Sequence, residues 1–318
     1  MNRKRFFLIC AAAAVLFICV MLKVFLYFGY NRAVTKICET PGLDSEFVPQ
    51  GSSKLIAENT YLFCGYMGND EPSRVFLVKN GDVKMIKLRN TDGSDYNWHA
   101  GGITCAGEYV YISNAGQLFI INKSELLRAP DGGTVQFAGS VEVPCRSSFC
   151  SCDGNMLYVG EYHAKGYDTD GSHMLSTPDG SQYYALVFAY RLSPAAAYGI
   201  DSSSPVAVYS ICDKIQGFAV APGGRAVLSQ SAGVMNSYLK YYDINGGADG
   251  TFNYNSKSVP LYSLDSKRFI NELKMPRMSE DIECVDGKIL VSFEAGAKKF
   301  GGGALPFTEK HCVLIDID

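Results

Sequence analysis

One phrase recurs along the chain and limits the possible folds more than any other feature. It consists of a polar residue or glycine pair, a large apolar residue, a short strand, a glycine-containing turn and a second apolar strand. A repeat of this size cannot bury its apolar face alone, so successive copies must stack against one another. The copies lie at 49–66 (the weakest), 99–113, 146–161, 215–231 and 279–294. Helical periodicity is almost absent after residue 48, which indicates an all-β sandwich, barrel or propeller.

The spacing of the copies favours a propeller. Aligned residues in successive copies are 51, 46, 69 and 64 residues apart, and the shorter steps suit blades of four strands with tight turns. Third strands are predicted at 74–79, 117–122, 184–191, 238–243 and 312–317. The fifth copy has no fourth strand, and we expect residues 43–48 to supply it. The repeat therefore predicts a five-bladed β-propeller over 43–318, or six blades if 186–212 hold a degenerate one.

The amino-terminal region has the pattern of a membrane anchor. Residues 6–22 form a run of 17 uncharged residues, preceded by the basic cluster Arg3-Lys4-Arg5 and followed by Lys23. With the next apolar residues the run is long enough to span a bilayer, and the positive-inside rule keeps its start in the cytoplasm. This predicts a cytoplasmic tail at 1–5, one transmembrane signal-anchor helix at 6–30, a linker at 31–42 and an extracytoplasmic domain. Secretion after signal cleavage is the alternative.

The charge balance restricts the partners. The whole chain carries −3, but residues 33–318 hold 24 basic and 32 acidic side chains. A domain of net charge −8 repels phosphate backbones, so nucleic acid is excluded as an expected partner. The expected partners are the membrane, through residues 6–30, and a small molecule, glycan or protein at one propeller face.

Four phrases resemble a family of secreted or membrane-anchored bacterial β-propeller proteins without an established activity. They are VPQG, HAGGI, GFAVAPGGRAVLSQSAG and MSEDIECVDGKILVSFEAGA. More distantly, the repeat is similar to lactonase-like and NHL-type propellers. The resemblance implies the propeller fold and export, and it assigns no catalytic residue.

Strand polarity predicts where polar residues gather. The first two strands of a blade are antiparallel, so the start of the first and the end of the second share one face. We expect the residues at these points to ring one mouth of the central channel. The candidate catalytic residues are Glu280, Glu294 and His99; the candidate ligand-binding residues are Gln50, Arg146, Gln216, Glu161, His163, Ser231 and Asp281.

Several chemistries are open to this set. Paired carboxylates at Glu280 and Glu294 suit acid–base work or a glycosidase, unless one of them pairs with Arg146. His99 suits a base or a metal ligand. Residues 168–170 resemble part of a calcium loop, although the full spacing is missing. No complete catalytic motif is present, so we expect a binding module, with a carbohydrate- or lactone-type hydrolase or lyase as the alternative.

Overall fold

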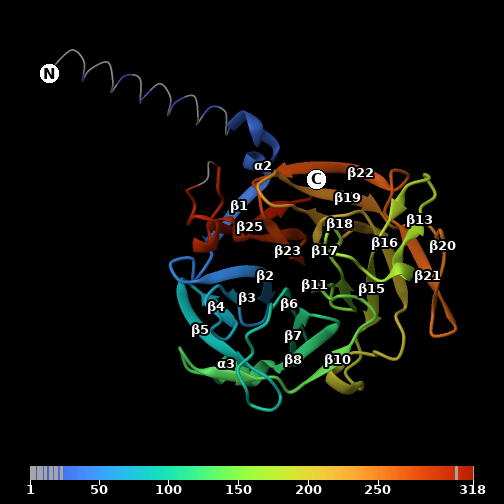
Figure 1. The fold of residues 1–318 in the computed structure, drawn as a ribbon, viewed down its shortest axis with the longest axis horizontal. Helices are drawn as coiled ribbons and strands as arrows, with labels where there is room; N and C mark the ends of the chain where they lie inside the picture. Colours follow the sequence, from blue (N-terminus) through green and yellow to red (C-terminus); the bar gives the residue numbers. More distant parts are fainter. Residues whose placement is uncertain are drawn as a thin grey trace.

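The computed structural model describes residues 24–304 and 307–317, together with residues 5, 10, 13, 17 and 21. Five antiparallel sheets of four or more strands form a ring around one axis, and the sequence runs around this ring in order (Figure 1). The innermost strands contact one another in the same order, and the last contacts the first. The fold is therefore a five-bladed β-propeller, as the repeat predicted.

Each blade has its strands in chain order from the axis outward, except that the fifth is completed from the other end of the chain. Blade 1 is β2 (Phe47–Leu55), β3 (Thr60–Met67), β4 (Arg74–Lys79) and β5 (Asp82–Arg89); blade 2 is β6 (Gly102–Ala106), β7 (Tyr109–Asn114), β8 (Gln117–Asn122) and β10 (Gly139–Glu142); blade 3 is β11 (Phe149–Cys152), β12 (Met156–Gly160), β15 (Ala185–Arg191) and β16 (Ala207–Ile211); blade 4 is β17 (Ile215–Ala221), β18 (Arg225–Gln230), β19 (Ser237–Asp243) and β22 (Phe269–Met275); blade 5 is β23 (Ser279–Val285), β24 (Lys288–Phe293), β25 (His311–Asp316) and β1 (Val34–Glu39). Residues 186–212 thus belong to the outer strands of blade 3, which removes the six-blade alternative.

The ring is closed by β1, which pairs antiparallel with β25. The prediction that residues 43–48 close the ring was wrong. Residues 41–46 form turns, and residues 47 and 48 already belong to β2. The predicted linker at 31–42 contains the closing strand, so the propeller begins earlier in the chain than expected.

The amino-terminal region is described only in part. Among the residues that the structure describes, no helix is both long and apolar enough to cross a membrane. Most of the predicted span at 6–30 before residue 24 lies outside the described residues. The short helix α2 (Phe28–Ala33) leads directly into β1, and its Tyr30 is buried against the propeller.

Two neighbouring pairs of blades are joined at their outer edges. The strand β9 (Thr134–Gln136) follows the short helix α3 (Lys123–Arg128) and pairs parallel with β5 of blade 1. The strand β21 (Lys257–Ser263), with its hairpin partner β20 (Gly250–Tyr254), pairs parallel with β16 of blade 3. These additions cover edges that would otherwise expose unpaired backbone groups.

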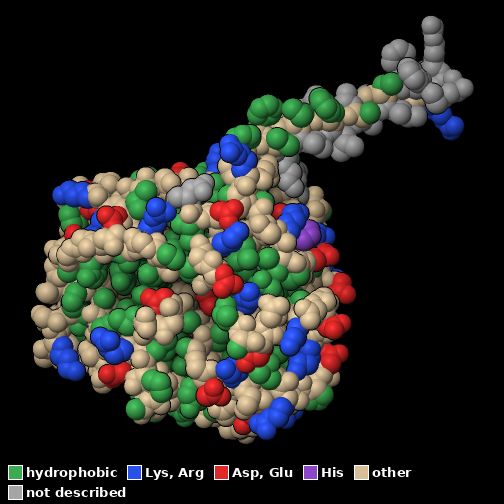
Figure 2. Space-filling view, turned by 180° about the vertical axis from the view of Figure 1, so that it is seen from behind, with side chains coloured by type: hydrophobic (Ala, Val, Ile, Leu, Met, Phe, Trp, Pro, Cys, Tyr) green, Lys and Arg blue, Asp and Glu red, His purple; other side chains and the backbone are tan. Residues whose placement is uncertain are grey.

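The apolar core is divided among the blades. Five clusters of buried side chains are found in the described part of the chain, one between each pair of neighbouring blades. Between blades 5 and 1, for example, Phe47 and Phe76 pack edge to face at 4.8 Å beside Leu290. Acidic and basic side chains are interspersed on the face shown in Figure 2.

The axis of the channel is filled by close backbone contacts. A Cβ atom on Gly217 would lie 2.7 Å from the backbone nitrogen of Ile282, and one on Gly51 would lie 2.9 Å from that of Ile103. Only glycine permits this approach, because such distances are shorter than real Cβ contacts. The filled axis separates two mouths. We call the one where the first strands begin the upper mouth, and the one where they end the lower mouth.

Candidate functional site

Backbone bulges shape the upper mouth. In three blades the first strand starts with a β-bulge, at Gln50 in β2, at Gln216 in β17 and at residues 280–281 in β23. A bulge inserts an extra residue and re-aims its side chain. Gln50 thereby reaches the neighbouring blade, where its Nε2 donates a hydrogen bond to Oε2 of Glu294 at 3.1 Å.

The two carboxyl groups expected to converge are in contact. Glu280 and Glu294 share a hydrogen bond, and Glu280 is only 3% exposed. Burial raises the pKa of Glu294 to about 7. Burial, and then the Glu294 carboxylate, raises the pKa of Glu280 well above its usual value. The pair therefore retains a proton near neutral pH, and Oε1 of Glu280 has no hydrogen-bond partner among the described residues.

An aromatic pair lies on the rim beside these carboxyls. The rings of Tyr66 and His99 are stacked with centroids 4.1 Å apart. Lys299 donates to the Tyr66 hydroxyl at 2.6 Å and lies 4.9 Å from the centre of that ring. Desolvation, and then the Lys299 charge, lowers the pKa of His99, so its ring is neutral at pH 7. Lys299 was not predicted; it belongs to the glycine-rich segment after Glu294, whose composition indicated a loop and not a contact.

Asp281 does not lie on the rim as predicted. It is fully buried at the axis, where its carboxylate accepts the backbone N–H groups of Ile103 at 3.2 Å and Ile282 at 2.9 Å. A Cβ on Gly102 would lie 2.5 Å from Oδ2 of Asp281, so glycine makes room for the carboxylate. The bulge explains the difference, because it turns Glu280 toward the mouth and Asp281 into the channel. Asp281 therefore links blade 5 to blade 2.

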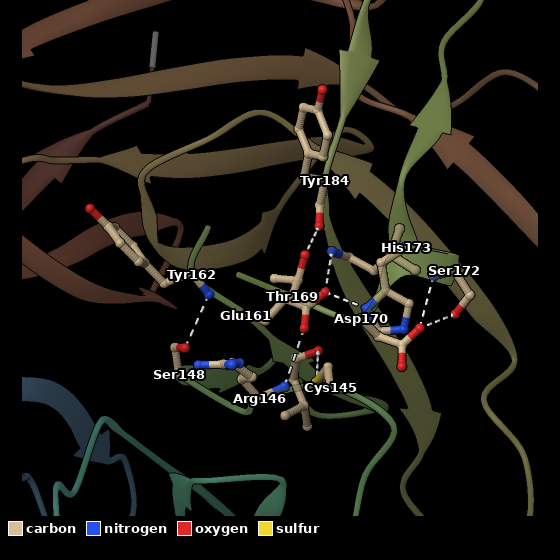
Figure 3. A network of polar contacts seen from close by, with 12 residues as sticks. Cys145, Arg146, Ser148, Glu161, Tyr162, Thr169, Asp170, Ser172, His173 and Tyr184 are labelled. Carbon is tan, nitrogen blue, oxygen red and sulfur yellow. Dashed lines mark hydrogen bonds and ion pairs between the residues drawn. The ribbon is translucent and has the colours of Figure 1, made fainter. Parts of the chain in front are cut away.

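Glu161 lies away from the axis and pairs with a histidine that was not predicted (Figure 3). The Nδ1 atom of His173 is 2.5 Å from Oε1 of Glu161, and both residues are buried. The Glu161 carboxylate also accepts the backbone N–H groups of Arg146 and Leu186, each at 3.2 Å. His173 sits in the short 3₁₀ turn η1 (Gly171–His173), within an irregular loop that has no periodicity to reveal its direction.

Three other candidates have partners that differ from those expected. The guanidinium of Arg146 forms no ion pair with the carboxylates of the described residues; only its backbone N–H binds Glu161. His163 does not face the same way as Glu161, since β12 ends at Gly160, and its Nδ1 lies 2.8 Å from Oδ1 of Asp213. Ser231 is buried and accepts a hydrogen bond from Ser237.

The lower mouth forms a cavity of about 590 Å³, lined by all five blades. Glu283 lies in its wall and is 5% exposed. Its carboxyl accepts a hydrogen bond from Oγ1 of Thr104 at 2.8 Å, and burial raises its pKa to about 8. Cys105, Cys152 and Cys284 line the same cavity.

Metal-ligand geometry is absent from the part of the chain that the structure describes, where no three His, Cys, Asp or Glu side chains are grouped to hold an ion. In the segment that resembles a calcium loop, Oδ1 of Asp170 accepts hydrogen bonds from the N–H and hydroxyl of Ser172 and so caps η1. The structure thus gives Asp170 a local structural role.

No protein-family model and no curated protein matches the chain. Among solved structures, similarity is found to a putative oxidoreductase (glucose dehydrogenase) from Thermus thermophilus, at 14% identity, 89% and 98% coverage of the two chains and a TM-score of 0.42. The PQQ-bound aldose sugar dehydrogenase of Streptomyces coelicolor has 12% identity, 82% and 77% coverage and a TM-score of 0.40. Hydrazine synthase of Kuenenia stuttgartiensis has 14% identity and a TM-score of 0.38; the match covers 80% of this chain and 57% of that one. Similarities of this size carry no argument about activity, and the fold assignment here rests on the strand pairing.

Proposed function

We propose that the chain is a membrane-anchored, extracytoplasmic β-propeller whose upper mouth binds a small polyhydroxylated molecule, such as a glycan. The observation that carries the proposal is the buried Glu280–Glu294 pair, which holds a proton near neutral pH and leaves Oε1 of Glu280 without a partner among the described residues. Such a pair offers both a donor and an acceptor. A hydroxyl group needs this combination, because it donates one hydrogen bond and accepts others.

The rim supplies the flat surfaces that a sugar ring packs against. Tyr66 and His99 are stacked on one another, and Trp98 beside them in sequence is 69% exposed. Binding sites for small molecules combine aromatic walls with a few polar groups that fix orientation. Here Lys299 and the carboxyl pair are those polar groups.

The contact between the two carboxyls favours binding over glycoside hydrolysis. Retaining glycosidases hold their carboxyl groups about 5–5.5 Å apart and inverting enzymes hold them about 6.5–9.5 Å apart, so that the substrate and water fit between them. Glu280 and Glu294 are hydrogen-bonded to one another, which leaves no room for a glycosidic bond between them.

The single tryptophan offers a direct test of binding. Trp98 is the only tryptophan of the chain, so its emission reports on the upper mouth alone. The full chain in detergent is titrated with cellobiose, chitobiose and maltose. We expect a saturable change with at least one of them. In the double variant Glu280→Gln/Glu294→Gln the affinity should fall by about 10–100-fold, the loss expected for one or two hydrogen bonds to a charged group.

The control is Glu272→Gln, which neutralises an exposed carboxylate on the outermost strand of blade 4 and should leave the titration unchanged. Circular dichroism of each variant checks that the fold is intact. If none of the disaccharides changes the emission, or if the double variant binds as well as the parent chain, the proposal is wrong.

A further inference from the structure

A cavity of about 390 Å³ lies off the axis, between blades 2 and 3 on the side of the upper mouth. One wall is the turn after β7 and the segment before β11, which ends at Arg146. The opposite wall is the loop after β12, with Thr169, Asp170 and His173 (Figure 3). Glu161 lines the cavity too, and no residue of the Glu280–Glu294 pair does, so this is a separate site.

The hydrogen bonds around His173 fix which ring nitrogen carries the proton. Glu161 already accepts two backbone N–H groups, so its carboxylate acts as an acceptor and Nδ1 of His173 is the donor to it. The neutral imidazole then has a free lone pair on Nε2. His173 is 3% exposed, lines the cavity, and has no hydrogen-bond partner on Nε2 among the described residues. A buried acceptor held in one orientation is ready for a hydroxyl donor.

Arg146 brings the opposite requirement to the same cavity. Its guanidinium makes no hydrogen bond or ion pair with any residue that the structure describes. Its backbone N–H is bound to Glu161, so the start of the side chain is fixed relative to His173. Asp170 is the one other charged residue of the wall besides Glu161, and Oδ1 of Asp170 is occupied by Ser172. A free guanidinium binds carboxylates through two parallel hydrogen bonds.

We propose that this cavity binds a small 2-hydroxycarboxylate, with its carboxylate on Arg146 and its hydroxyl donating to Nε2 of His173. The pairing of a cation with a neutral acceptor selects a molecule that carries an anionic group and a hydroxyl donor together. The volume is at the lower end of the range for small-molecule sites, which suits an acid of a few carbons.

The experiment uses lactate as the probe and His173 as the reporter. The full chain has four histidines, so the imidazole signals in a nitrogen-15 spectrum can be assigned by comparison with His173→Gln. We expect lactate to shift the His173 Nε2 signal in a saturable way. Propionate lacks the hydroxyl and lactamide lacks the charge, and each should bind at least about 10-fold more weakly, the cost of one unmade hydrogen bond to a buried or charged partner.

Arg146→Gln should lose lactate binding, whereas Arg191→Gln, which removes an exposed guanidinium at the end of β15, should not. The Nδ1 proton signal, which depends on Glu161, shows in both variants whether the pair is intact. Lactate and propionate binding equally well, or no saturable shift of His173, would overturn the proposal. Because Trp98 reports on the upper mouth and His173 on this cavity, a failure of one proposal is distinguishable from a failure of the other.

Discussion

At the scale of single residues, the buried acids make stability depend on pH. Burial raises the pKa of Glu283 from 4.5 to about 8, so the native state holds its proton more tightly than the unfolded chain does. The stabilisation is therefore complete below pH 4.5 and is lost as the pH rises through 8, with a slope of up to about 1.4 kcal/mol per pH unit. Glu283→Gln removes this dependence. We expect the variant to match the parent chain at about pH 5 and to be more stable by at least about 1 kcal/mol at about pH 8.5, measured by urea unfolding.

Glu309→Gln is the matched control with the opposite sign. Burial alone would raise the pKa of Glu309, but hydrogen bonds from His311 and the charge of Lys36 bring it below its usual value. Its stabilisation is present above the unfolded pKa and is lost as the pH falls, so this variant should be less stable than the parent at about pH 8.5. A shift of both variants in the same direction would contradict the assignment.

At the scale of elements, two cysteines face one another across the closing strands. Cys38 of β1 is the register partner of Cys312 of β25, and both thiols are uncombined in the structure. Directly opposed residues of antiparallel strands have Cα atoms about 4.5–5.5 Å apart, a separation that a disulfide can bridge. We expect oxidised glutathione to form this disulfide, seen by peptide mapping without reduction, and to stabilise the domain by about 2–4 kcal/mol, because it closes a very long loop. Cys38→Ser should abolish the gain; a gain that persists in this variant would rule out the pair.

The same strands show where sequence reasoning succeeds and where it stops. The prediction of a third strand at 117–122 coincides with β8, because a glycine turn and an apolar alternation mark that hairpin locally. The closing strand was misplaced, since its pairing joins residues nearly the whole chain apart and its exposure pattern does not alternate. Glu280 and Glu294 were predictable from strand polarity. His173 was not, because an irregular loop carries it to Glu161.

At the scale of the whole molecule, the chain between the predicted anchor and the propeller is short and docked. Tyr27 and Tyr30 are buried, and their hydroxyls bind Asn236 and Glu309 at 2.7 and 3.3 Å. The helix α2 then continues without a break into β1. The segment that follows the apolar run is thus part of the domain, and an anchored propeller would be held close to the bilayer surface.

This arrangement gives a prediction for intact cells. The basic residues Arg3, Lys4 and Arg5 should stay in the cytoplasm, and the domain after residue 33, with its net charge of −8, should lie on the other side. Protease added to spheroplasts should therefore digest the propeller and leave a fragment protected only at the amino-terminal end. Replacing the three basic residues with glutamate should reduce the digested fraction, because orientation follows the positive charges next to the span. The matched change of Lys79, Lys84 and Lys87 to glutamate, far from the predicted span, should leave topology unchanged. Complete protection of the propeller in the parent chain would exclude the outward orientation.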